Sequence, residues 1–254
     1  MRLTLDLAPV ALVFLLSLRL AAVFFMTPVF SNLTRLNTVR VLFTLAMSVT
    51  LVLGLGLPVA KVDWGLGSLL LAAILEVVLG ATLAFGVFAA FGVFSLAGKL
   101  LDIQSGFGLG TVFDPVTRAS APVFSSMLNL LALAVFFALD GHHAMMRGLA
   151  YSVQQVPPGS SWSGLPLEAV LKQFGLMFSL ALALVAPCIF ALFLVEVGTA
   201  VLSRALPQMN VLVLGVSLKI VVALVIFALS LGSALPLMGR IYASIFLYWE
   251  QVLT

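Results

Sequence analysis

Four charged residues lie inside otherwise apolar stretches of the sequence: Arg19, Glu76, Glu196 and Lys219. A charged side chain is costly in a bilayer, so it normally faces an opposite charge or water. Two kinds of chemistry fit these residues: a relay that moves a proton or an ion, and ion pairs within the chain or with a neighbouring subunit. Relays gather carboxylates along one path, whereas these charges are of mixed sign and fall one to a stretch. The pattern favours ion pairing.

Other residue patterns point away from catalysis. Gly106, Gly108 and Gly110 form Gly-x-Gly-x-Gly, but no strand precedes them and no Gly-Lys-Ser/Thr follows, so neither a dinucleotide nor a phosphate loop is indicated. His142 and His143 are adjacent and do not share a helical face as an i, i+4 pair does. A polar turn at the membrane boundary suits them better than a metal site. We therefore expect no catalytic residue, no cofactor and no metal.

The composition is that of a membrane protein. Of the 254 residues, 63% are hydrophobic and 8% are charged, whereas about a quarter of a typical globular domain is charged. The net charge of +3 comes without a basic patch, which argues against nucleic-acid binding. The single cysteine excludes an intramolecular disulfide. We expect an all-α integral membrane protein.

Six main segments are apolar and about 20 residues or longer, as a membrane span requires: 8–30, 41–60, 77–98, 119–139, 173–195 and 220–239. Prolines are expected to break or kink several of them: Pro28, Pro58, Pro122, Pro187, Pro207 and Pro236. The long polar connection at 140–172 is the expected boundary between two halves. The last two segments, joined by a tight turn at 204–210, predict a compact C-terminal helical hairpin.

Glycines recur every six residues in the third segment, at Gly80, Gly86, Gly92 and Gly98. Each step of six turns about 240° around a helix, so the glycines occupy three faces instead of one seam. This spacing predicts a helix that is contacted closely on several sides. The alternative is that glycine is simply frequent in membrane helices.

One glycine-rich segment, residues 98–118, carries charges between two apolar runs. If its core is extended, the glycines at 106, 108 and 110 line one side, and Phe107 and Leu109 line the other. Asp114-Pro115 ends the core as a rigid turn. Such a segment can act as a movable seal, bulky enough to block an opening and flexible enough to be displaced. It can equally be a re-entrant connector that is packed permanently in protein.

Motifs spread over nearly the whole chain carry a family resemblance: Gly98, Asp102, Gln104, Gly106, Phe107, Gly108, Asp114, Pro115, Pro122, Asp140, Gly141, His142, Val156, Pro157, Arg204, Pro207, Gln208, Asn210, Gly215 and Lys219. In this order and spacing they resemble the FliR family, the flagellar branch of the FliR/SctT export-gate proteins of type III secretion. Ser217 departs from the pattern, because the family commonly has proline there. Asp140-Gly141-His142 and the Gly-Phe-Gly core favour the flagellar branch over the injectisome branch.

The resemblance implies a non-enzymatic subunit of the flagellar export gate, in the bacterial inner membrane at the flagellar basal body. Its partners would be FliP, FliQ, FlhB, membrane lipid and the unfolded flagellar subunits that pass through. Residues 1–170 would be FliP-like and residues 171–254 a FliQ-like hairpin. The buried charges would pair within the assembly. The pore plug would consist of Gly106, Phe107, Gly108, Leu109, Gly110, Thr111, Val112, Phe113, Asp114 and Pro115.

Two other functions compete with this one. A self-contained secondary transporter would line its pathway with the four charges in the apolar segments, but inverted repeats, which favour such a transporter, are not visible. A membrane enzyme is disfavoured because the sequence offers no acid–base cluster.

Overall fold

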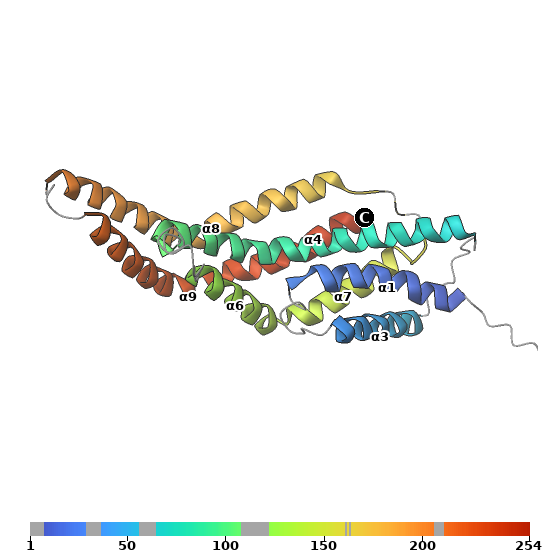
Figure 1. The fold of residues 1–254 in the computed structure, drawn as a ribbon. Coiled ribbons are helices and arrows are strands. Elements are labelled where there is room, and N and C mark those ends of the chain that lie inside the picture. The colour runs from blue at the N-terminus through green and yellow to red at the C-terminus, as the bar shows by residue number, and fades with distance from the viewer. Residues whose placement is uncertain are drawn as a thin grey trace, which may run out of the picture. The chain divides into compact units, whose positions relative to one another are not determined.

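The computed structural model describes residues 8–28, 37–55, 65–107, 122–160, 162, 164–205 and 211–254. These residues form seven helices (Figure 1): α1 (Ala8–Met26), α3 (Asn37–Leu55), α4 (Leu66–Ser105), α6 (Val123–Ala138), α7 (Gly141–Gln155), α8 (Leu167–Ala205) and α9 (Val211–Leu253). The all-α prediction is confirmed for this part of the chain.

Five of the described helices are long and apolar enough to cross a membrane, or up to six spans result if α6 and α7 form one broken span. Three of them are longer than the expected segments, since α4, α8 and α9 contain 40, 39 and 43 residues. Pro187 and Pro236 lie inside α8 and α9 and end neither helix. Membrane helices tolerate proline where neighbours satisfy the freed backbone groups. Pro122 instead lies at the N-cap of α6, and Pro58 and Pro207 lie outside the described residues.

Helix α7 corrects the sequence-based prediction, which placed residues 140–172 in a polar connection. The helix was missed because its sequence, GHHAMMRGLAYSVQQ, contains no long apolar run. Its buried residues recur on one face instead: Met145, Leu149, Ser152 and Val153. This spacing is that of an amphipathic helix, which buries one stripe and leaves the rest exposed.

The helices pack into two compact units. The first comprises Met1–Ala89, Asp140–Gln173 and Ala243–Thr254, and the second comprises Ala90–Leu139 and Phe174–Tyr242. The expected halves, 1–170 and 171–254, and their likeness to FliP and FliQ stay predictions. The long helices α4, α8 and α9 contribute residues to both units.

Aromatic side chains organise the second unit. Tyr242 of α9 stacks on Phe94 with ring centroids 5.7 Å apart and meets Phe91 and Phe136 edge-on. Its hydroxyl donates a 2.6 Å hydrogen bond to the carbonyl of Ala132 in α6. A buried tyrosine needs such a partner for its hydroxyl, and the bond fixes α9 against α6.

Four of the five glycines of α4, those that recur every six residues, face four different neighbours. A Cβ at Gly80 would meet the backbone of Arg19 in α1, and one at Gly98 would meet the backbone of Ser125 in α6. Likewise, Gly86 lies against Tyr248 of α9, and Gly92 lies against Met177 of α8. The predicted close contact on several sides is confirmed, and the neighbours belong to this chain.

Candidate functional site

Asp102 of α4 caps the first turn of α6. The first backbone N–H groups of a helix lack partners within the helix, and the N-cap residue, Pro122, makes no side-chain hydrogen bond to them. The carboxylate of Asp102 accepts hydrogen bonds from the backbone N–H groups of Phe124 and Ser125, at 2.8 and 3.0 Å, and from the Ser125 hydroxyl at 2.6 Å. A carboxylate also suits the positive end of the helix dipole. We call this arrangement the Asp102 clasp.

Packing brings α4 and α6 together around the clasp. Gly98 allows the backbone of Ser125 to approach, because a Cβ would lie 2.8 Å from its nitrogen. The Phe107 ring meets the Phe124 ring edge-on, with centroids 5.8 Å apart, and Phe124 in turn meets Phe227 of α9 at 5.5 Å. Gly106 has a φ of 91°, a conformation that favours glycine, and it ends α4 immediately before Phe107.

The clasp brings together the described residues that flank positions 108–121. The chain leaves the described structure after Phe107 and re-enters it at Pro122. Because the rings of Phe107 and Phe124 are in contact, the two flanking positions belong to one base, which consists of the packed end of α4 and start of α6. Of the predicted plug residues, Gly106 and Phe107 belong to this base, whereas those at 108–115 lie outside the described residues.

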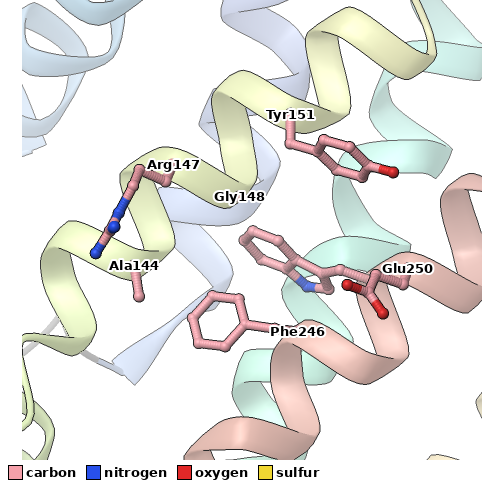
Figure 2. A pocket seen from close by; sticks show the side chains of 7 residues that line it. Ala144, Arg147, Gly148, Tyr151, Phe246 and Glu250 are labelled. Carbon is pink, nitrogen blue, oxygen red and sulfur yellow. The ribbon is translucent and has the colours of Figure 1, made fainter.

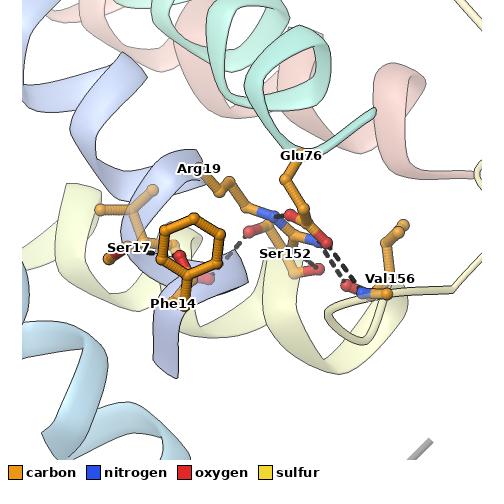
Figure 3. A network of polar contacts seen from close by, with 8 residues as sticks. Phe14, Ser17, Arg19, Glu76, Ser152 and Val156 are labelled. Carbon is orange, nitrogen blue, oxygen red and sulfur yellow. Dashed lines mark hydrogen bonds and ion pairs between the residues drawn. The ribbon is translucent and has the colours of Figure 1, made fainter. Parts of the chain in front are cut away.

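Arg19 and Glu76 form an ion pair inside the first unit (Figure 3). The Arg19 side chain is fully buried, and its Nε donates to Glu76 Oε2 at 2.6 Å while Nη2 donates to Oε1 at 3.1 Å. The other guanidinium contacts are the carbonyls of Ser152 at 3.1 Å and Val156 at 2.9 Å. Glu76 also accepts the backbone N–H of Gly159 at 3.0 Å. The network therefore joins α1, α4, α7 and the residues that follow α7.

Glu196 of α8 and Lys219 of α9 form a second pair, in the second unit. Their atoms Oε1 and Nζ are 3.4 Å apart, and the side chains are 56% and 19% exposed. Glu196 was expected to be buried and is not buried within this chain. Thr199, Ser203 and Gly215 line an open polar groove beside the pair.

Sequence reasoning missed one pocket, of about 280 Å³, between α7 and the end of α9. Figure 2 shows Arg147 and Tyr151 of α7 and Phe246 and Glu250 of α9 around it. Its inner wall is Trp249, whose indole N–H donates to the carbonyl of Leu83 at 2.9 Å. Gly148 makes room for this indole. The walls are mainly apolar, so the pocket is better suited to bind an apolar group than to catalyse a reaction.

The remaining motif residues are dispersed. Gln104 lies in the last turn of α4, Asp140, Gly141 and His142 lie at the start of α7, and Arg204 is exposed at the end of α8. Pro207, Gln208 and Asn210 lie outside the described residues. In the described ranges, these motif residues lie at the ends of different helices and do not converge on one reaction centre.

Comparison with known proteins decides the family. The family described as "Bacterial export proteins, family 1" matches residues 10–245. The chain belongs to this family. It is similar to the flagellar biosynthetic protein FliR of Escherichia coli (strain K12), with 28% identity over 90% of this chain and 87% of that protein. FliR of Aquifex aeolicus (strain VF5) is 27% identical over 91% and 90% of the two chains. The Yop proteins translocation protein T of Yersinia pestis is 26% identical over 62% and 63%.

Membership in this family establishes the chain as an export-gate component of the flagellar and type III secretion apparatus. Export-gate proteins of the FliR family are membrane proteins and are not enzymes.

Proposed function

We propose that this chain helps to build and to plug the pore of the flagellar export gate, through which unfolded flagellar subunits cross the bacterial inner membrane at the basal body. The Asp102 clasp carries the proposal, because it fixes both ends of the segment that contains the plug residues. A seal must be displaceable without loss of its anchor. Of the predicted plug residues, 106–115, those from 108 onward would supply the displaceable part, and Gly106 and Phe107 would belong to the anchor together with the clasp.

The proposed partners are FliP, FliQ and FlhB. Large apolar side chains are exposed along α8 and α9: Phe190, Phe193, Leu194, Val201, Val221 and Leu229. Exposed apolar surface on this scale indicates contact with other proteins or lipid. We place the companion subunits and membrane lipid on this surface. Residues 1–170 are proposed to take the role of a FliP-like part and residues 171–254 that of a FliQ-like hairpin.

The flagellar branch is favoured over the injectisome branch. Two FliR proteins align over about nine-tenths of this chain and the Bacillus subtilis FliR over 68%, against 62% for the Yersinia pestis translocation protein T. The Asp140-Gly141-His142 motif points the same way. Restored motility after expression in a FliR-deficient flagellated strain would support the flagellar assignment, and restored injectisome secretion alone would contradict it.

The plug is tested by ion leakage through the assembled gate. Residues Gly106 to Phe113 are deleted, or residues 108–113 are replaced by a Gly-Ser stretch of equal length that keeps Phe107 in the clasp. Both variants should co-purify with the companion subunits and make the membrane conduct small ions. The matched control is Glu168→Gln, which changes an exposed residue at the start of α8 and should leave conductance unchanged. If both assembled plug variants conduct no more than the wild type, the plug is wrong.

A second variant tests the anchor separately from the seal. Asp102→Ala removes the acceptor for two backbone N–H groups at the start of α6, which weakens the base and leaves residues 108–115 intact. Loss of such a cap costs about 0.5–2 kcal/mol. We expect partial leakage, below that of the deletion, from a complex of normal composition on native mass spectrometry.

A further inference from the structure

Three side chains that can bind metal gather in the first turn of α7: Asp140, His142 and His143. One ligand atom from each lies within 4.8 Å of the other two. The two imidazole rings are 4.1 Å apart, with planes inclined by 37°. Asp140 Oδ1 and His143 Nδ1 are 3.3 Å apart. The two histidines were expected not to share a helical face, but their rings lie side by side in the structure.

The carboxylate of Asp140 does not play the capping role that is usual at its position. Aspartate at an N-cap normally accepts a backbone N–H of the first turn. Asp140 occupies the N-cap of α7 with a left-handed backbone (φ 54°), and its side chain makes no capping hydrogen bond. The side chain contacts His143 instead. Both side chains are exposed, at 74% and 66%, so an ion can reach them from solvent.

We propose that Asp140, His142 and His143 bind a divalent transition-metal ion of the zinc class. Two imidazoles and one carboxylate are ligands that Zn²⁺ accepts, at about 2.0–2.2 Å from each donor. Tetrahedral bonds of that length place the donors roughly 3.3–3.5 Å apart. The observed separations thus need only small side-chain rotations. Water would complete the coordination. Mg²⁺ and Ca²⁺ are disfavoured, because they prefer sites made of oxygen donors.

Because of the dipole of α7, cation binding depends on the negative charge of Asp140. The N-terminal end of a helix is positive and disfavours a cation. The negative charge of Asp140 offsets this repulsion, which the two neutral imidazoles cannot do. A site that depends on all three groups therefore differs measurably from adventitious binding by two neighbouring histidines.

Zinc binding to the full-length, detergent-solubilised chain tests the proposal after any affinity tag has been removed. His142 and His143 are the two histidines of the whole sequence, so the imidazole signal in Co²⁺ absorption or Cu²⁺ spin-resonance spectra reports this site. Calorimetry with Zn²⁺ should give one ion per chain. Asp140→Asn and His143→Ala should each lower the Zn²⁺ affinity by about tenfold or more.

The matched control is Glu168→Gln, an exposed carboxylate in the first turn of α8, which should leave the Zn²⁺ affinity unchanged. Saturable binding that falls in both site variants and persists in the control supports the site. Absence of saturable Zn²⁺ binding to the wild type, or an unchanged affinity in Asp140→Asn, would overturn it. Neither readout depends on pore activity, so a failed zinc site leaves the proposed plug standing.

Discussion

Two ion pairs between long apolar helices, Arg19–Glu76 in the first packing unit and Lys219–Glu196 in the second, have similar chemistry and opposite surroundings. Arg19 and Glu76 are 0% and 4% exposed and 2.6 Å apart, whereas Lys219 and Glu196 are 19% and 56% exposed and 3.4 Å apart. The first pair also binds two carbonyls and one backbone N–H of the chain. Among the described residues, no further side-chain hydrogen bond supports the second pair.

This difference predicts a structural role for the first pair and an interface role for the second. A buried ion pair is stable only when further hydrogen bonds satisfy its remaining donors and acceptors, and the Arg19–Glu76 network provides them within one chain. Exposed pairs contribute little by themselves. Because charges on apolar helices need a partner or water, we infer that the Glu196–Lys219 pair is completed outside this chain.

The largest expected effect follows from Glu76→Gln. The amide keeps one acceptor oxygen but leaves the buried Arg19 charge without a counter-ion, and its NH₂ group would face other donors. Breaking one side of a buried pair costs about 3–5 kcal/mol. We expect a strong loss of yield and a lower thermal unfolding midpoint of the solubilised chain.

The comparison for Glu76→Gln is Arg19→Met combined with Glu76→Leu. Replacing both charges by apolar groups of similar size is often neutral, because no uncompensated charge remains. The double variant should thus be more stable than Glu76→Gln alone. If Glu76→Gln unfolds at the same temperature as Glu168→Gln, the pair is not structural.

The second prediction compares two glycines close to these pairs. Gly80 lies four residues after Glu76, and a Cβ there would meet the Arg19 carbonyl oxygen at 2.5 Å. Gly198 lies two residues after Glu196, and a Cβ there would meet nothing within 4 Å. Gly80→Ala should push α1 from α4 and cost about 1–3 kcal/mol. Gly198→Ala should stabilise α8 by up to about 1 kcal/mol.

Thermal unfolding of the two alanine variants in one detergent checks this contrast. Opposite shifts of the unfolding midpoint are expected, downward for Gly80→Ala and upward for Gly198→Ala. Equal shifts would mean that close backbone contact between α1 and α4 does not support the Arg19–Glu76 pair.

The sequence predicted the charges of these pairs but not their partners. Arg19 and Glu76 are 57 positions apart, and nothing in the spacing selects one carboxylate over another. Six of the described helices could be predicted, because each consists mainly of one continuous apolar run that is visible in the sequence. Helix α7 was missed because its buried residues form a stripe that can be recognised only from their helical spacing. Asp102 was recognised by family resemblance, but its capping role depends on α6, which begins about twenty residues later.

Glu196→Gln has the smallest expected effect on the isolated chain and the most informative one on the assembly. Removing one charge of an exposed pair changes the free energy of unfolding by about 0–1 kcal/mol, so the unfolding midpoint should scarcely move. If companion subunits complete the pair, the same substitution should reduce the FliP and FliQ recovered with the chain. Native mass spectrometry of the co-purified complex measures that loss, and Glu168→Gln serves as the control. Unchanged recovery together with an unchanged midpoint would show that Glu196 acts neither in the fold nor at an interface. A large drop in the midpoint would instead make the two ion pairs alike and remove the contrast between structural and interface charges.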